Sequence, residues 1–250
     1  MISVCLASFN GEEYIRLQIE SILRQLSDED ELIISDDGSS DRTVHIIQSI
    51  GDRRIKLYQN HFHSPINNFE FLLGEASGDI IITSDQDDLW LEGRVSEVEK
   101  MHNEKDVQLI ICKCQTINGE GKVLKESFYS EDDPVSHSLL HNLWKNPYLG
   151  CCLSMTKEVI PYILPFPPKI AMHDIWEGLV VQAFFKVAYY GERPLVQYRR
   201  HGDNFTTLHK YPISYKIQYR YYFLKELIKR KFKMRRYRSQ VVKANNNQET

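Results

Sequence analysis

Residues 79–90 read Asp-Ile-Ile-Ile-Thr-Ser-Asp-Gln-Asp-Asp-Leu-Trp, a short apolar run that ends in a loop rich in carboxylates. The same order, strand-like residues and then a polar loop, occurs at residues 1–11 and 31–41, and helix-like segments follow at 14–26 and 43–50. Strands that alternate with amphipathic helices at this spacing are typical of βαβ units. The sequence therefore predicts an α/β fold with a Rossmann-like, mostly parallel mixed sheet flanked by helices.

Later segments extend this pattern with less regular spacing. The expected elements are strands at 55–58, 108–114, 150–155 and 195–198, helices at 66–75, 94–102 and 175–185, and a hairpin turn at 118–121. No repeat and no Gly/Ser-rich linker divides them.

Composition places the chain among ordinary globular proteins. Of its 250 residues, 42% are hydrophobic and 26% are charged, which excludes collagen-like, coiled-coil and low-complexity classes. Apolar runs stay far below the ~20 residues that cross a bilayer, and the N-terminus lacks the charged start of a signal peptide. The five cysteines show no C-x-x-C spacing, so we expect a protein of the reducing cytoplasm.

Basic charge is concentrated near the C-terminus. Residues 210–238 contain 11 of the 31 Lys and Arg residues but one of the 34 acidic residues, in a chain of net charge −3. We expect this segment to contact an anionic membrane surface, which would make the protein peripheral on the inner face of the cell membrane, and to bind no specific nucleic acid. The alternative is a helix that packs its apolar stripe on the rest of the chain.

Ligands of open parallel sheets bind beyond the carboxyl ends of the strands, where this chain has Asp36, Asp37 and the loop after residue 84. Helix capping or a turn explains each loop taken alone. In an extended chain, however, Asp85 and Asp87 point the same way and repel each other. A divalent cation relieves that repulsion, and oxygen ligands favour Mn²⁺ or Mg²⁺ bound together with phosphate oxygens.

Five motifs, in this order along the chain, resemble those of glycosyltransferase family 2. They are residues 7–12 (Ala-Ser-Phe-Asn-Gly-Glu), 35–41 (Ser-Asp-Asp-Gly-Ser-Ser-Asp), 85–90 (Asp-Gln-Asp-Asp-Leu-Trp), 173–176 (His-Asp-Ile-Trp) and 198–204 (Tyr-Arg-Arg-His-Gly-Asp-Asn). The likeness is greatest to bacterial rhamnosyltransferase-type and galactosyltransferase-type enzymes of polysaccharide assembly. It implies a GT-A fold, a nucleotide-sugar donor, a divalent metal and inversion at the anomeric carbon.

The resemblance covers residues 1–205, with a nucleotide-binding half at 1–90 and an acceptor half at 91–205. It leaves residues 206–250 as a basic, helical C-terminal extension.

The same resemblance assigns the donor site. The residues expected at the nucleotide sugar are Ala7, Phe9, Asn10, Glu12, Asp36, Asp37, Asp85 and Gln86. Phe9 would stack on the nucleobase, and Asp36 or Asp37 would accept the imino proton of uracil or thymine. The expected metal ligands are Asp85, Asp87 and His201, while Asp88 would support the loop.

On the acceptor side, the resemblance makes Asp174 the catalytic base. The alternative is that Asp174 only caps a helix at 175–185. Trp90, His173 and Trp176 are expected near the acceptor, although both Trp rings fit a core position equally well. Cys151 and Cys152 are expected to serve packing.

The implied reaction is transfer of a sugar from a UDP- or dTDP-sugar to a hydroxyl of a glycan or lipid-linked saccharide in cell-surface polysaccharide synthesis. Two alternatives stay open. A sugar-1-phosphate nucleotidyltransferase shares such a nucleotide domain, but the first strand lacks the Gly-rich phosphate loop. A non-catalytic module of a polysaccharide assembly complex would not need the carboxylates at 85, 87 and 174.

Overall fold

Seven strands form the central sheet of the protein, which is described from a computed structural model of residues 1–129, 134–202 and 212–246, with side chains as far as Met234. Their order is β10-β6-β9-β4-β1-β2-β3. The strands are β1 (Ile2–Ser8), β2 (Glu31–Asp36), β3 (Ile55–Gln59), β4 (Ile80–Asp85), β6 (Leu109–Cys112), β9 (Leu153–Thr156) and β10 (Val187–Tyr190). All neighbours pair in parallel except β9, which runs antiparallel between β4 and β6. The expected mostly parallel mixed sheet is confirmed.

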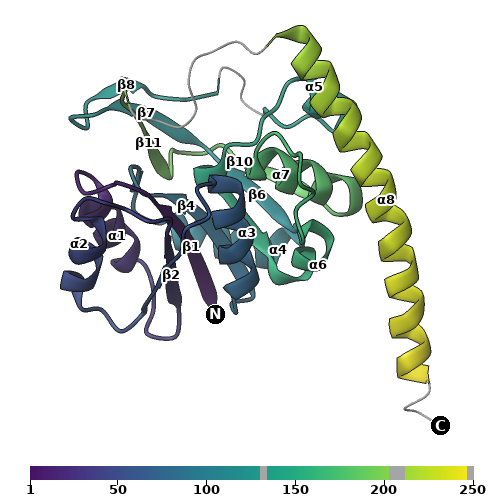
Figure 1. Ribbon diagram of the computed structural model, residues 1–250, viewed down its shortest axis with the longest axis horizontal. Helices are drawn as coiled ribbons and strands as arrows, with labels where there is room; N and C mark the ends of the chain where they lie inside the picture. Colours follow the sequence, from purple (N-terminus) through teal and green to yellow (C-terminus); the bar gives the residue numbers. More distant parts are fainter. Residues whose placement is uncertain (130–133, 203–211, 247–250) are drawn as a thin grey trace.

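Helices cover both faces of this sheet (Figure 1). They are α1 (Ile15–Leu23), α2 (Thr43–Ile50), α3 (Pro65–Glu75), α4 (Arg94–Lys105), α5 (Leu139–Trp144), α6 (Ile160–Ile163), α7 (His173–Phe184) and α8 (Ile213–Asn246), with short 3-10 turns η1 (Gly150–Cys152) and η2 (Lys157–Val159). Successive residues of β1 enter different cores: Val4 and Leu6 pack with α1 residues, whereas Cys5 packs with α3 residues. Burial on both faces explains the uninterrupted apolar runs Val4–Leu6 in β1 and Ile80–Ile82 in β4.

A second sheet lies beyond the carboxyl edge of the first, at the top of Figure 1. It contains β5 (Leu89–Trp90), β11 (Val196–Arg200), β7 (Cys114–Asn118) and β8 (Val123–Lys125), in that order. The expected hairpin at 118–121 is confirmed, because β7 and β8 pair antiparallel across it.

The single strand expected at 108–114 is wrong, because the chain leaves the central sheet at Lys113. Its N–H donates to Tyr190 in β10 at 2.8 Å, and its carbonyl accepts from the Leu195 N–H at 2.9 Å. The two halves therefore become β6 and β7, in different sheets. The strand expected at 150–155 begins only at Leu153, after η1, and β10 is an additional strand.

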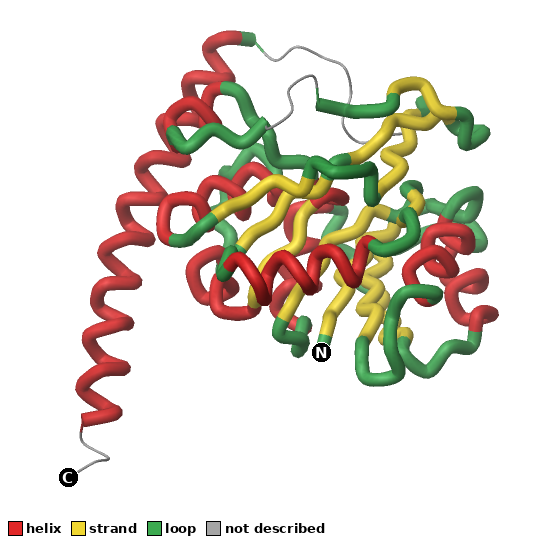
Figure 2. The backbone as a smooth tube through the Cα atoms, turned by 180° about the vertical axis from the view of Figure 1, so that it is seen from behind, coloured by secondary structure: helices red, strands yellow, loops and turns green. Residues whose placement is uncertain are grey.

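Among the described residues, no helix combines the length and the apolar composition needed to cross a bilayer. Figure 2 shows α8 along one side of the domain, beside the helical layer rather than within it.

Candidate functional site

The loops that follow β1, β2 and β4 meet at one edge of the central sheet. The strand register places Ser8 opposite Asp36 and Ala7 opposite Asp85. Three of the motifs singled out in the sequence therefore begin side by side, as expected for a ligand site at the carboxyl ends of parallel strands.

Phe9 presents its ring to solvent, with 51% of the residue exposed. The Phe9 N–H donates to Gln86 Oε1 at 2.8 Å, and Gln86 Nε2 donates to the Phe9 carbonyl at 2.9 Å. This reciprocal pair fixes the backbone below the ring. Gln86, expected at the nucleotide sugar, is thus placed where it holds the candidate stacking residue.

Asn10 and Glu12 join the loop after β1 to the loop after β2. Asn10 has φ 47°, a left-handed conformation that Asn tolerates, and its Oδ1 accepts from the Ser40 N–H at 2.8 Å. Glu12 accepts from the backbone N–H and the Nε–H of Arg42, at 3.0 and 3.1 Å. These hydrogen bonds hold the pKa of Glu12 below its usual value.

Asp36 and Asp37 are both buried and both already accept hydrogen bonds. Asp36 accepts from Ser8 Oγ at 2.9 Å and from the Ser39 N–H at 2.8 Å. Asp37 accepts from three successive backbone N–H groups of residues 62–64. Asp37 therefore anchors the loop between β3 and α3, and any bond to a nucleobase would use a further lone pair of these oxygens.

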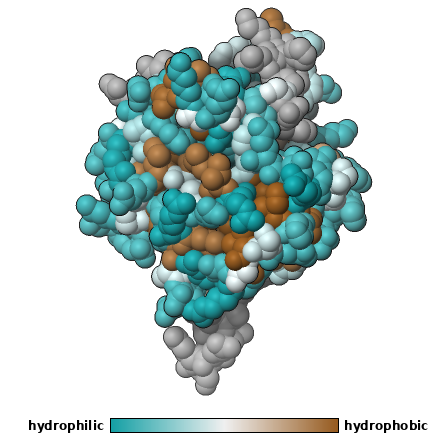
Figure 3. Space-filling view, turned by 90° about the vertical axis from the view of Figure 1, so that its left-hand side faces the viewer, coloured by the Kyte–Doolittle hydropathy of each residue, from teal (hydrophilic) through white to brown (hydrophobic). Residues whose placement is uncertain are grey.

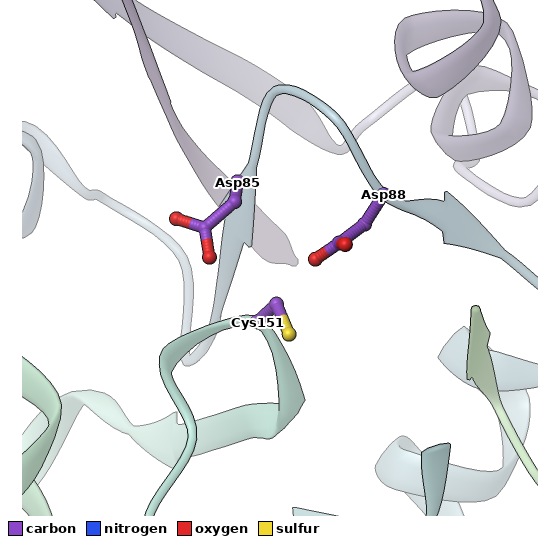
Figure 4. A group of neighbouring side chains, drawn as sticks. All are labelled: Asp85, Asp88 and Cys151. Atoms are coloured by element: carbon purple, nitrogen blue, oxygen red, sulfur yellow. The ribbon is translucent and has the colours of Figure 1, made fainter. Parts of the chain in front are cut away.

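Among the described residues, Asp85, Asp88 and Cys151 form a group that could hold a cation, with ligand atoms within 4.8 Å of one another (Figure 4). Burial raises the pKa of Asp85 to about 7, and the charge of Asp87 adds to that rise. Asp88 is fully buried: Oδ1 accepts from the Arg199 N–H at 2.9 Å, which confirms its role in the loop. Its Oδ2 accepts no N–H or O–H within the described residues, and the Cys151 thiol is its polar neighbour.

Cys151 and Cys152 are both buried in the core, which confirms the packing role expected for them. In addition, η1 sets the Cys151 thiol beside Asp85 and Asp88, a contact that sequence reasoning missed. No spacing in the sequence reveals this, because residues 85 and 151 meet only once β9 inserts antiparallel beside β4.

Asp87 and His201, expected as metal ligands, lie in contact although 114 residues separate them. His201 Nε2 is 2.8 Å from Asp87 Oδ2. The contact arises because His201 follows β11, and β11 pairs with β5 directly after the Asp87 loop. Arg199 Nε also donates to the Asp87 carbonyl at 2.7 Å, which fixes the loop to β11.

Asp174 lies in the first turn of α7 and faces η1. Its Oδ2 accepts from the Gly150 N–H at 3.1 Å, and its Oδ1 accepts from the Ile175 N–H at 2.7 Å. Burial raises the pKa of Asp174; the charge of His173 opposes that rise and the charge of Glu177 adds to it. The interpretation of Asp174 as the N-cap is wrong, because α7 begins at His173 and Met172 is its N-cap.

His173 is buried and turned away from solvent. Its Nδ1 lies 3.0 Å from Glu177 Oε1, and its ring stacks on Phe69 with centroids 3.8 Å apart. Against the opposing effect of burial, the charge of Glu177 raises the pKa of His173. The charge of His173 in turn opposes the rise in the pKa of Asp174, and burial of the ring leaves it little surface for contact with an acceptor.

Trp90 and Trp176 occupy core positions. Trp90 is 5% exposed and lies under the Arg94 guanidinium, while Trp176 is 1% exposed and donates its Nε1–H to Ile163. Neither ring offers a face to a sugar, so the acceptor-stacking expectation is wrong and the core alternative is correct.

The site thus combines an exposed aromatic ring, a cluster of carboxylates and a separate carboxylate at the start of a facing helix. The charge of Asp174 is one cause of the raised pKa of Asp85, so the two carboxylates act on each other across the site. A mostly parallel sheet with one inserted antiparallel strand, and with carboxylates at this edge, is an α/β fold of the GT-A type. The family model "Glycosyl transferase family 2" matches residues 3–156, and the chain belongs to this family.

Two of the curated relatives are named as glucosyltransferases that act on undecaprenol-linked saccharides. The chain is 28% identical over 172 residues to the Escherichia coli UDP-Glc:alpha-D-GlcNAc-diphosphoundecaprenol beta-1,3-glucosyltransferase WfgD, covering 68% of this chain and 66% of the relative. It is 34% identical over 129 residues to the Campylobacter jejuni GalNAc(5)-diNAcBac-PP-undecaprenol beta-1,3-glucosyltransferase, covering 50% of this chain and 41% of that one. The chain thus spans about two thirds of the first relative and less than half of the second.

Among solved structures, S. aureus TarS 1–349 in complex with UDP-GlcNAc superposes with a TM-score of 0.65 at 17% identity. The match covers 93% of this chain and 72% of that chain. It shows a shared fold.

Proposed function

We propose that this protein transfers a sugar, with inversion, from a UDP- or dTDP-sugar to a hydroxyl of a glycan or lipid-linked saccharide, at the cytoplasmic face of the membrane. The observation that carries the proposal is that η1 contacts both ends of the site. The Gly150 N–H donates to Asp174 Oδ2 at 3.1 Å, and the thiol of the next residue, Cys151, lies within 4.8 Å of carboxylate oxygens of Asp85 and Asp88. The names of both bacterial relatives describe beta-1,3-glucosyltransferases of undecaprenol-linked saccharides, and the TarS structure contains UDP-GlcNAc, which supports this choice of donor and acceptor.

The donor end of the reaction uses the loops after β1 and β4. The exposed Phe9 ring, held from below by Gln86, is free to stack on a pyrimidine. Asp36 or Asp37 then accepts the imino proton with a remaining lone pair.

The residues fit the Mn²⁺ or Mg²⁺ that the family implies. Buried carboxyl groups with raised pKa values and the unsatisfied Asp88 Oδ2 indicate an arrangement that a cation would stabilise. Asp85 and Asp87 would hold the ion with His201, and a bound ion would offset the charge of the departing nucleoside diphosphate. The Cys151 thiol adds a softer donor beside Asp88.

At the acceptor end, Asp174 takes the proton of the acceptor hydroxyl as that oxygen bonds to the anomeric carbon and the nucleoside diphosphate leaves with its bonding electrons. A raised pKa makes this carboxylate a stronger base than an exposed Asp. The Gly150 N–H and the Ile175 N–H fix both of its oxygens, so its direction is set before substrate binds. A single displacement of this kind inverts the anomeric centre.

Nucleotide titration with and without EDTA tests the donor assignment. Asp87→Ala should weaken Mn²⁺-dependent UDP or dTDP binding by about 100-fold, and His201→Ala by about tenfold, as expected for a ligand and a supporting contact. Asp28→Ala removes an exposed carboxylate elsewhere and should bind as the wild type does. Wild-type protein that binds these nucleotides equally well in EDTA would contradict the metal assignment.

A further inference from the structure

The outward surface of α8 carries apolar side chains that the donor and acceptor sites do not use. Ile217, Tyr221, Ile228 and Phe232 are 56%, 70%, 57% and 60% exposed. At 100° per residue, these four positions fall within about 60° of one another around the helix axis. We call these four residues the outer stripe.

A different face of α8 attaches the helix to the domain. Phe223, Leu227 and Met234 are 5%, 9% and 3% exposed, and the Phe223 ring meets Trp176 edge-on at 5.6 Å. Arg230 adds hydrogen bonds to the carbonyls of residues 164 and 165. The helix is therefore docked through one face, and this docking fixes the outer stripe in the direction away from the core.

Positive charge borders the outer stripe on both sides. Lys225 and Lys229 follow it on one side and Lys231 on the other, and all three are exposed. The one acid between Ile213 and Met234, Glu226, lies on the opposite side of the helix and pairs with Lys229 at 2.7 Å. An apolar stripe bordered by lysines, with no acidic residue in the border, fits a partner surface that has an apolar interior beneath a layer of negative charge.

Helix α5 extends this surface. Leu140 and Trp144 are 65% and 68% exposed. The Arg220 guanidinium lies 4.4 Å from the centroid of the Trp144 ring and donates to the carbonyls of Leu143 and Trp144, which ties α5 to the first turns of α8. An exposed Trp ring held beside an Arg guanidinium is characteristic of protein surfaces at the lipid headgroup level.

We propose that the outer stripe and Trp144 lie in the headgroup region of an anionic lipid bilayer, with the transferase domain above it. The proposal agrees with a lipid-linked acceptor but does not depend on it, because binding to vesicles is measured without donor or acceptor. Exposed apolar residues are not enough to indicate membrane binding, because apolar surface is also visible on the α1–α2 side of the domain (Figure 3). There, Leu17 is 51% exposed, but Glu20 pairs with both Arg16 and Arg24, so this surface carries charges of both signs close to the apolar residue.

Sedimentation of the full chain with vesicles tests the proposal. Ile228→Ser combined with Phe232→Ser should bind vesicles of phosphatidylcholine and phosphatidylglycerol about tenfold more weakly than the wild type, because two inserted side chains are lost. Leu17→Ser combined with Leu124→Ser removes two exposed leucines elsewhere and should bind as the wild type does. Changing Lys225, Lys229 and Lys231 to Gln should abolish the preference for vesicles with phosphatidylglycerol over vesicles of pure phosphatidylcholine. Salt at about 1 M should have the same effect on the wild type, because it shortens the Debye length to about 3 Å.

Fluorescence supplies an independent readout. The chain has three Trp residues, and Trp90 and Trp176 are buried, so an emission shift on adding vesicles reports on Trp144. We expect a blue shift with anionic vesicles that Trp144→Phe removes, with unchanged thermal unfolding and donor hydrolysis in every variant. Equal vesicle binding by the outer-stripe variant and the wild type, or no shift at Trp144, overturns the proposal. A third result would also overturn it. If the outer-stripe variant turns a dimer into a monomer and leaves vesicle binding unchanged, the outer stripe joins two copies of the chain.

Discussion

The Gln86 amide both donates to and accepts from the Phe9 backbone, so one side chain fixes the loop that carries the exposed ring. Gly11 makes this possible, because a Cβ at that position would lie 2.3 Å from Gln86 Oε1. The glycine in the first motif is thus required by a close side-chain approach rather than by a left-handed backbone.

Gly11→Ala should therefore displace Gln86 and weaken nucleotide binding by about tenfold, a loss typical of a disturbed supporting contact. The double variant with Gln86→Ala should bind no worse than Gln86→Ala alone, because the clashing amide is gone. Isothermal titration with UDP checks both values. Fully additive losses would show that Gly11 acts through something other than Gln86.

Asp174→Asn keeps the size of the side chain and one accepting oxygen but removes the base. We expect transfer to fall by about 100-fold or more while donor affinity stays near wild type. In the wild type, the rate should rise with pH until the Asp174 carboxyl is ionised, and its raised pKa moves that rise toward neutral pH. Initial transfer rates measured across a range of pH test this prediction, and Asp106→Asn, which changes an exposed carboxylate, is the control. Full activity of Asp174→Asn would show that another residue is the base.

At the level of elements, Glu31 at the start of β2 connects four segments. It accepts from Ser3 in β1, from Ser77 before β4 at 2.7 Å, and from Lys56 in β3. Burial alone would raise the pKa of Glu31, but these hydrogen bonds outweigh it and lower the pKa to about 2. The carboxylate therefore helps to align the strands that carry the site.

A carboxyl group whose pKa is lower in the folded than in the unfolded protein stabilises the fold at pH values above its unfolded-state pKa. This stabilisation is lost as the pH falls toward the folded-state pKa. Glu31→Gln should thus lower the free energy of unfolding by about 1–3 kcal/mol near pH 7, the size of a charged hydrogen-bond network. The difference from wild type should shrink between about pH 4 and pH 2. Urea titrations at several pH values measure it, with exposed Glu29→Gln as control; a deficit that does not change with pH would indicate a purely steric role.

The elements from β1 to β4 are predictable because each has a local pattern: apolar runs buried on both faces form strands, and helical spacing separates them. The predictions fail where long-range pairing decides. Residues 109–118 contain no Gly or Pro that would mark a break, yet Lys113 takes its hydrogen-bond partners from residues 190 and 195, and the chain divides there between two sheets. β10 is short and partly exposed along most of its length, so it lacks the apolar run of a central strand.

The candidate site follows the same division. Asp36 and Asp85 were predictable because strand ends place them, and Asp174 was singled out by the motif at residues 173–176. The place of Cys151 depends on the insertion of β9. The burial of both Trp rings could not be read from the sequence either, since Trp176 is covered by Phe223 of a helix that begins 37 residues later.

At the scale of the whole molecule, the two sheets have different tasks. The central sheet brings the donor loops together, and the smaller sheet closes over them through the contacts that Arg199 and His201 make with the Asp87 loop. Helix α8 lies outside both sheets and docks through Trp176, so its outward surface is held in a fixed relation to Asp174 in α7. A domain oriented in this way would meet a lipid-linked acceptor from a constant direction.

The products formed by the wild-type protein test the proposed transfer most directly. With Mn²⁺, a panel of UDP- and dTDP-sugars and an undecaprenol-type acceptor analogue, we expect release of UDP or dTDP together with a glycosylated acceptor of inverted anomeric configuration, assigned by NMR. A product of retained configuration would contradict this function, as would release of pyrophosphate when the protein is given UTP or dTTP together with a sugar 1-phosphate.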